Sequence, residues 1–229
     1  LSSKDTTPGQ IIAVYDNLLK DEPKDNFTIG IVDDVTHLSL PVTREPNVGG
    51  KDVSQLIFYG LGSDGTVGAN KNTIKLIGDN TDYYAQAYFA YDSKKSGGVT
   101  RSHLRFGKNP IKSTYLVREA NFISCSIDTY LEKYDMLSEL KDQGTFLLNT
   151  SKTVKELLEF MPNSVKIVLA KKHAKFFIID AITLAQEIGL GNRTNTIMQS
   201  AFFKLNEQIM PYAEAQELMK QYAYKSYIK

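Results

Sequence analysis

A glycine-rich turn between a predicted strand and a predicted helix constrains this chain more than any other feature. The apolar stretch Gln55–Tyr59 predicts a buried strand, and the pattern that follows predicts a helix over Thr66–Ile77 that stops at Gly78. The glycines between them have the spacing G-x-G-x-x-G and are Gly60, Gly62 and Gly65. This order of strand, glycine turn and helix is typical of α/β folds.

The same turn is a candidate anion site, because it places backbone N–H groups at the N-terminus of a helix. The alternative is a tight turn between strand and helix that binds nothing. The turn is not a Walker A motif, since Lys71 stands between Asn70 and Asn72 rather than before Ser or Thr. Nucleotide hydrolysis by the P-loop route is therefore disfavoured.

Several stretches resemble one known family. The segment Gly60–Asn72 resembles the signature of the gamma-type domain of the pyruvate:ferredoxin (flavodoxin) oxidoreductase family. Ser96–Gly107 is similar to a second loop of that family, and Gly191–Thr196 resembles a further segment. Leu1–Pro8 and Phe27–Pro41 resemble the region just upstream of that domain in the long single-chain enzymes.

The resemblance implies a large homodimeric enzyme that decarboxylates pyruvate on thiamine diphosphate. Such an enzyme passes electrons through iron–sulfur clusters to ferredoxin or flavodoxin and forms acetyl-CoA. The chain begins at Leu1 rather than at Met, and we expect it to be excised from that longer polypeptide and to be inactive alone. The resemblance implies that this domain helps to bind coenzyme A and contacts other domains, which hold the thiamine diphosphate and the clusters.

A second loop, Asp92–Gly98, follows the predicted strand Ala85–Tyr91 and should face the same crevice as the glycine turn, beyond the carboxyl ends of the strands. We expect Lys94 and Lys95 to bind phosphate beside glycine N–H groups, although most such lysine pairs are solvated turns. The predicted cofactor-binding residues are Gly60, Gly62, Ser63, Asp64, Gly65, Thr66, Gly68, Asn70, Lys71, Lys94, Lys95, Ser96, Gly97, Gly98 and Arg101. No catalytic residue and no metal ligand is predicted.

Two other functions remain open from the residues alone. A freestanding NAD(P)-binding α/β oxidoreductase would need an acidic residue about 20 positions past the glycines, and Asp92 lies 27 positions past Gly65. The two lysines that follow suit an additional phosphate, as in NADP or coenzyme A, and the resemblance favours coenzyme A. The third possibility is a scaffold domain with an empty turn. His103 could transfer a proton near a coenzyme thiol, but a histidine in this position more often orders its own loop.

Composition excludes several classes of partner. Net charge is +1, from 27 basic and 26 acidic residues, which provides no field for nucleic acid or for a membrane surface. Cys125 is the only cysteine, so the chain cannot supply a four-cysteine iron–sulfur site or an intrachain disulfide. Cys125 lies in an apolar pattern and is expected to be a buried thiol in a reducing compartment. No apolar run is long enough to cross a bilayer, and we expect a cytoplasmic protein.

Strand and helix patterns alternate along the chain, which predicts a layered α/β/α domain with a mixed, mostly parallel sheet. The further predicted elements are strands at Tyr115–Val117, Asn121–Ser126, Thr145–Leu148 and Val165–Ala170, and helices at Thr129–Leu140 and Ser151–Phe160. A helical C-terminal tail, residues 180–229, is broken at Gly189–Gly191 and Pro211, with Asn192 or Thr194 as a helix cap.

The first residues of the chain differ from the rest. Thr7 and Pro8 predict a helix start, and Phe27–Val32 predicts a strand. We expect residues 1–45 to be a segment of a preceding domain or linker, and residues 46–229 to be the gamma-type domain.

Overall fold

The structure of the chain, a computed structural model, describes residues 6–33, 35–50, 52–92 and 97–227. The chain divides into two compact units, residues 1–50 and 51–229. The first unit contains helix α1 (Pro8–Leu18), whose start agrees with the prediction. Thr7 and Gln10 form a reciprocal capping box at that start, and Pro8 occupies the first turn.

The strand predicted over Phe27–Val32 is wrong. Within the described part of the first unit, this stretch forms only an isolated bridge between Thr28 and Ser39. Gly30 has φ +78°, which interrupts the extended backbone that a strand requires. The buried hydrophobic cluster of this unit is correspondingly small and consists of Ala13, Ile29 and Leu40.

The second unit is built on a six-stranded sheet in the order β2-β3-β1-β4-β5-β6. The strands are β1 (Val53–Leu61), β2 (Tyr84–Tyr91), β3 (Val99–Gly107), β4 (Ala120–Cys125), β5 (Leu140–Asn149) and β6 (Lys175–Ile179). β3 is antiparallel to both of its neighbours, and the remaining pairs are parallel. All described strands except β3 therefore end at the same edge of the sheet, which confirms the mixed, mostly parallel sheet.

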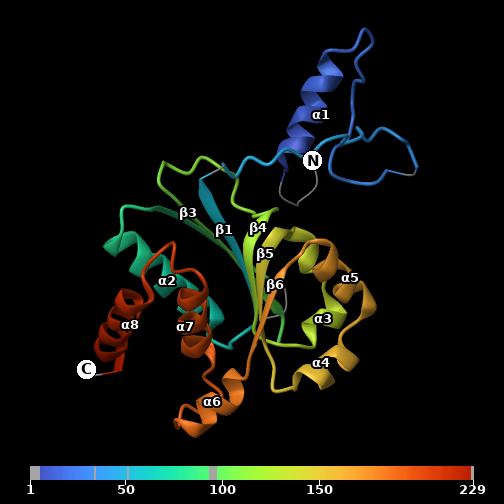
Figure 1. The fold of residues 1–229 in the computed structure, drawn as a ribbon. Helices are drawn as coiled ribbons and strands as arrows, with labels where there is room; N and C mark the ends of the chain where they lie inside the picture. The colour runs from blue at the N-terminus through green and yellow to red at the C-terminus, as the bar shows by residue number, and fades with distance from the viewer. Residues whose placement is uncertain (1–5, 34, 51, 93–96, 228–229) are drawn as a thin grey trace. The chain divides into compact units, whose positions relative to one another are not determined.

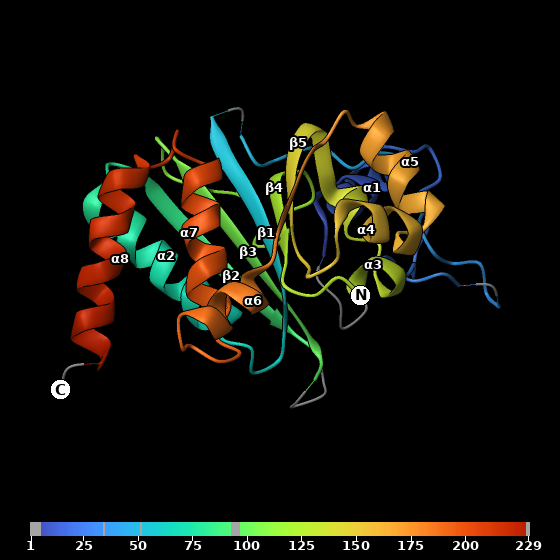
Figure 2. The same cartoon turned by 60° about the horizontal axis from the view of Figure 1, so that its bottom comes forward.

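Helices cover both faces of this sheet (Figures 1 and 2). One face carries α2 (Thr66–Asn80), α7 (Asn195–Leu205) and α8 (Tyr212–Tyr227). The other carries α3 (Tyr130–Lys133), the 3₁₀ turn η1 (Leu137–Glu139), α4 (Val154–Phe160) and α5 (Asn163–Lys171). The short helix α6 (Ala181–Glu187) follows β6. This arrangement confirms the layered fold and the helical C-terminal tail, whose breaks fall where Gly189–Gly191 and Pro211 predict them.

The side chains of β1 point alternately to the two faces of the sheet and contribute to the hydrophobic core on each face. Ile57 and Tyr59 pack with the helices α3 to α5, while Leu56 and Phe58 pack with α2, α7 and α8. On the second face, the rings of Phe58, Phe122 and Phe202 have their centroids 5.4–5.7 Å apart. These rings fix α7 over β1 and β4 and so position the helix that borders the candidate site.

Several local predictions are wrong for identifiable reasons. Val165–Ala170 is part of helix α5 rather than a strand, because its apolar residues contact the core at helical spacing. The strand that occupies this place in the sheet is β6, which the sequence reading missed. The segment Thr129–Leu140 forms only α3 and η1, since Tyr134 is extended, with φ −132° and ψ 137°.

Three further boundaries differ. α2 continues past Gly78 to Asn80. Helix α4 begins at Val154 and not at Ser151 as predicted, because Thr153 caps it and forms a capping box with Glu156. The segment Tyr115–Val117 is irregular because its backbone binds side chains of β3 instead of another strand.

The aromatic cluster predicts where the fold is most sensitive. Phe202→Ala should lower the free energy of unfolding by about 3–5 kcal/mol, since Phe202 is buried among other rings. Tyr224→Ala, in α8 and 66% exposed, should change it by less than about 0.5 kcal/mol. Urea unfolding followed by circular dichroism measures both, and equal effects would contradict the packing described here.

Candidate functional site

The glycine turn, residues 60–65, is held in shape by one carboxylate. Asp64 accepts hydrogen bonds from the backbone N–H of Leu61 and of Thr66, both at 2.8 Å. It also accepts one from the Ser126 hydroxyl, at 2.8 Å. Asp64 was predicted to bind a cofactor, but in this arrangement its oxygens serve the turn itself and the end of β4.

The glycines of the turn are required for different reasons. A Cβ on Gly60 would stand 2.7 Å from the Thr66 Cβ, so only glycine allows α2 to start so close to β1. Gly65 has φ +86° and lies against Asn195, whose side chain would be 3.1 Å from an added Cβ. Gly62 is constrained by the second loop, because its Cβ would stand 3.3 Å from the Gly98 carbonyl oxygen.

The two loops predicted to share a crevice do lie together. The Gly62 N–H donates to the Gly98 carbonyl at 2.8 Å. The segment Ser96–Gly107, which resembles a loop of the family, is mostly strand, because Val99–Gly107 forms β3. Between the two turns lies a cleft of about 360 Å³. Its lining residues are Leu61, Gly62, Ser63, Asp64, Gly65, Val67, Tyr91, Asp92, Gly98, Val99 and Thr100.

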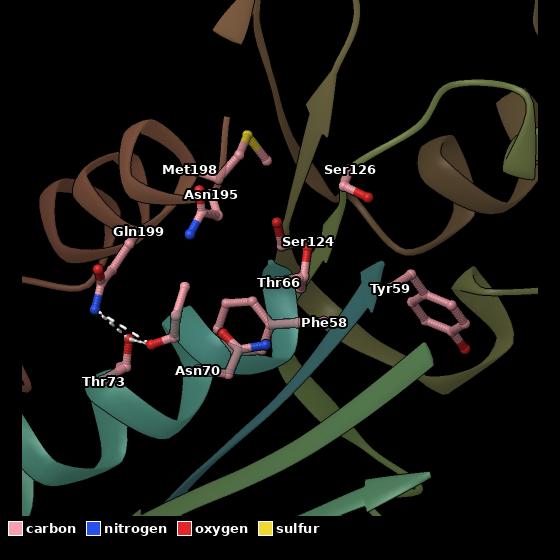
Figure 3. Close-up of a pocket in the computed structure, with 11 residues that line it drawn as sticks. Phe58, Tyr59, Thr66, Asn70, Thr73, Ser124, Ser126, Asn195, Met198 and Gln199 are labelled. Atoms are coloured by element: carbon pink, nitrogen blue, oxygen red, sulfur yellow. Dashed lines mark hydrogen bonds between the residues drawn. The ribbon is translucent and has the colours of Figure 1, made fainter. Parts of the chain in front are cut away.

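A smaller cavity lies between the first turns of α2 and α7 (Figure 3). Its volume is about 20 Å³, enough for about one water molecule. Thr66 and Asn70 border it, together with Ser124 and Asn195. Asn70 is 4% exposed and its amide nitrogen has no partner in the described structure, so a buried donor is available here.

Some predicted site residues are placed elsewhere. The Lys71 ammonium lies over the Phe89 ring, 5.4 Å from its centroid, and lines neither the cleft nor the cavity. Arg101 is opposite Tyr59 in the β1–β3 register and interacts with the Tyr59 hydroxyl on the face of the sheet away from α2. Lys94, Lys95 and Ser96 fall outside the described residues.

The sequence reading missed the contribution of α7. The Gln199 amide donates to the Thr73 hydroxyl at 2.9 Å and to the Ala69 carbonyl at 3.3 Å, which ties α7 to α2. Thr194 occupies the predicted cap position, but its side chain makes no capping hydrogen bond. The resemblance of Gly191–Thr196 to a family segment was the signal that could have placed Asn195 at the glycine turn.

His103 lies in β3 and is 2% exposed. Its Nδ1 accepts a hydrogen bond from the Val117 N–H at 3.2 Å. Burial, with help from the charges of Arg101, Arg105 and Arg118, lowers the pKa of His103 to about 3. The imidazole is therefore neutral near pH 7, lines neither cavity, and fastens the segment before β4 to the sheet.

Cys125 is fully buried, which confirms the predicted buried thiol, and burial raises the pKa of this thiol to about 12. The described residues contain no group of three or more His, Cys, Asp and Glu that could hold a metal ion. Among the helices of the described ranges, none is long and apolar enough to cross a membrane.

Comparison with known families identifies the fold's relatives. The family described as pyruvate ferredoxin/flavodoxin oxidoreductase matches residues 55–228. The chain belongs to this family. It is 55% identical, over 96% of its length, to the pyruvate-flavodoxin oxidoreductase of Enterobacter agglomerans, of which it covers 19%. The chain thus spans about a fifth of the length of the curated relatives it matches.

Solved structures share the fold at low identity. The pyruvate oxidoreductase subunit PORC from Thermotoga maritima superposes with a TM-score of 0.61 at 18% identity, over 78% of this chain and 88% of that one. The 2-oxoglutarate:ferredoxin oxidoreductase from Magnetococcus marinus, with 2-oxoglutarate, coenzyme A and succinyl-CoA bound, superposes with a TM-score of 0.50 at 12% identity. That match covers 75% of this chain and 30% of that one.

The neutral His103 predicts a pH dependence of stability. Its pKa is about 3 in the folded chain against 6.5 in the unfolded one, so below pH 6.5 only the unfolded chain takes up the proton. Unfolding should become easier as pH falls from 6.5 to about 5, with a slope approaching about 1.4 kcal/mol per pH unit. His103→Asn keeps an acceptor for the Val117 N–H but cannot titrate. Urea unfolding across this range should show a smaller slope for the variant, and parallel curves would contradict the assignment.

Proposed function

We propose that the chain is one domain of an enzyme that oxidatively decarboxylates pyruvate with coenzyme A. The products are acetyl-CoA and CO₂, and ferredoxin or flavodoxin is reduced. In this proposal the chain holds part of coenzyme A and contacts the other domains of a cytoplasmic homodimer. Thiamine diphosphate and the iron–sulfur clusters bind outside this chain, which is consistent with its single, buried cysteine.

One observation carries the coenzyme A part of the proposal. Two glycine turns, one after β1 and one after β2, meet at the edge where parallel strands end, joined by the bond from Gly62 to Gly98. Open α/β sheets bind ligands at this edge, and glycine N–H groups at a helix start suit phosphate oxygens. The cleft between the turns is open and large enough for a diphosphate group. The Magnetococcus marinus relative, which shares the fold, was solved with coenzyme A bound.

Gly68 gives independent support. It lies in the first turns of α2, and an added Cβ would meet nothing within 4 Å. Glycine costs a helix about 0.5–1 kcal/mol relative to alanine, and no contact within the described chain explains that cost. A ligand or a neighbouring domain that approaches this point would explain it, and the unpartnered amide of Asn70 lies two residues further on.

The remaining members of the site follow from chemistry and chain position. Lys94 and Lys95 lie between the described residues Asp92 and Gly97 and are proposed to bind phosphate oxygens through charge-assisted hydrogen bonds. Ser63, Thr66 and Gly97 are proposed as neutral donors, while Gly60 and Asp64 position the turn. The proposal does not rest on Lys71 or Arg101, which line neither cavity.

We also propose that residues 1–45 belong to a segment that precedes the gamma-type domain. The support is an apolar face of α1 that its own unit leaves uncovered. Ile11, Tyr15 and Leu18 follow one another at helical spacing and are 48%, 65% and 61% exposed. A helix with such a face needs an apolar partner, which another part of the parent polypeptide would provide.

The isolated chain should not oxidise pyruvate. It lacks cysteines for iron–sulfur clusters, and the other cofactor sites are proposed to lie in other domains. The measurement is pyruvate-dependent dye reduction by the purified 229-residue chain, with added coenzyme A and thiamine diphosphate. Turnover above the level without pyruvate would refute the assignment of the chain as a partial enzyme.

Gly68→Ala in the full-length enzyme separates a binding role from a folding role. The substitution should raise the stability of the chain by about 0.5–1 kcal/mol, yet raise KM for coenzyme A about tenfold, equivalent to about 1.4 kcal/mol. Decarboxylation of pyruvate should stay unchanged. The melting temperature and the two kinetic assays measure these effects.

Gly78→Ala is the matched control, because Gly78 is also in α2 and its Cβ would make only an ordinary 3.9 Å contact with Ala85. It should stabilise without changing KM. If Gly68→Ala behaves in the same way as this control, the start of α2 at Gly68 has no role in coenzyme A binding.

A further inference from the structure

The start of helix α2 is poorly suited to be helical by itself. Residues 66–73 read TVGANKNT and are mostly threonine, valine, glycine and asparagine, which rank low in helix propensity. The cap residue, Gly65, has no side chain, and the first turn carries no acidic residue. Asp64 holds the N–H of Thr66, but the turns beyond that point need support from another element of the fold.

Helix α7 provides this support through one side chain. Gln199 is 6% exposed, and its amide donates to the Thr73 hydroxyl at 2.9 Å and to the Ala69 carbonyl at 3.3 Å (Figure 3). The Thr73 hydroxyl donates to the same carbonyl at 3.0 Å. Gln199 therefore holds α2 at two positions that lie about one helical turn apart.

A buried amide is a costly way to fill this position. It loses rotamer freedom and its hydration, whereas an unbranched apolar side chain of similar length would fill the same space. Unlike apolar contacts, hydrogen bonds depend strongly on direction, so the amide fixes how α2 is rotated and shifted against α7. The same face of α7 places Asn195 against Gly65 and packs the Phe202 ring on Phe58. The position of the start of α2 over the sheet is thus set from α7.

We propose that Gln199 is a positioning residue for coenzyme A. It borders the small cavity but not the cleft between the glycine turns, so it acts through α2 and not by touching the coenzyme. By holding the first two turns of α2, it keeps Gly65 and Gly68 in the geometry that binds the coenzyme. This inference rests on the proposed function. Pyruvate decarboxylation, which is proposed to take place in other domains, does not depend on Gln199.

Gln199→Met in the full-length enzyme tests the proposal. Methionine is unbranched and of similar size, so it fills the space without donating a hydrogen bond. KM for coenzyme A should rise about fivefold, the value of one net hydrogen bond, and decarboxylation of pyruvate should keep its rate. Gln216→Met is the matched control, because this exposed glutamine of α8 bonds within its own helix, to the Tyr212 hydroxyl at 3.4 Å, and should change neither quantity. If Gln199→Met does not fold, Thr73→Val removes the stronger of the two bonds and should raise KM in the same way.

Hydrogen exchange of the full-length enzyme without coenzyme separates positioning from a general loss of stability. In Gln199→Met, peptides that cover residues 66–73 should exchange severalfold faster than in the wild type. Peptides from β4 and β5 should exchange at the wild-type rate, because the core of the sheet does not depend on this amide. Mass spectrometry of the digested protein measures both regions in one experiment.

The possible outcomes are distinct. Unchanged exchange at residues 66–73, equally faster exchange throughout the domain, or slower decarboxylation overturns the proposal. So does a normal KM for coenzyme A in Gln199→Met when Gly68→Ala raises it, and in that case the proposed function stands. If Gly68→Ala also leaves KM unchanged, the proposed function fails and this inference fails with it. Faster exchange confined to residues 66–73, together with a raised KM and unchanged decarboxylation, supports Gln199 as the positioning residue.

Discussion

The carboxylate of Asp64 is the interaction on which the candidate site depends. It joins the end of β1, the start of α2 and the end of β4 through bonds to Leu61, Thr66 and Ser126. Charge-assisted hydrogen bonds of this kind are stronger than neutral ones. These bonds, together with the one from the Gly62 N–H to the Gly98 carbonyl, hold the turn by contacts within the chain itself. The turn is therefore formed before any ligand binds.

The second constraint is the direction of β3. Because β3 runs antiparallel between β1 and β2, it leaves β2 parallel to β1, and both strands end at the same edge. The turn that leads from β2 into β3 then meets the glycine turn, as the bond between Gly62 and Gly98 shows. The same topology makes β2 the outermost strand on that side.

Much of this architecture follows from local patterns. The buried strand before Gly60, the helix after Gly65 and the start of α1 at Thr7 and Pro8 were predicted because glycine turns and capping residues act within a few neighbouring positions. The segment Val165–Ala170 misled, since a short apolar run suits a buried strand and a helix equally. In the structure this segment is helical, because its apolar residues contact the core at helical spacing, and β6 takes the place in the sheet that was predicted for it.

The parts that could not be predicted depend on distant partners. β3 carries His103 and Arg105, which read as loop residues. In the fold, Arg105 is 2% exposed and its guanidinium binds the carbonyls of Thr114, Tyr115 and Leu116. Nothing local in the sequence indicates that these groups will meet. Asn195 likewise reaches the glycine turn only because the rings around Phe202 fix α7 above β1.

A cryo-electron microscopy structure of the full-length enzyme with coenzyme A bound tests the central claim most directly. The account predicts that the diphosphate of coenzyme A lies in the cleft between the two glycine turns. It should be within hydrogen-bonding distance of backbone N–H groups at Gly65 or Gly98 and close to Lys94 and Lys95. Coenzyme A held entirely by other domains, with this cleft empty or filled by a neighbouring domain, would contradict the account.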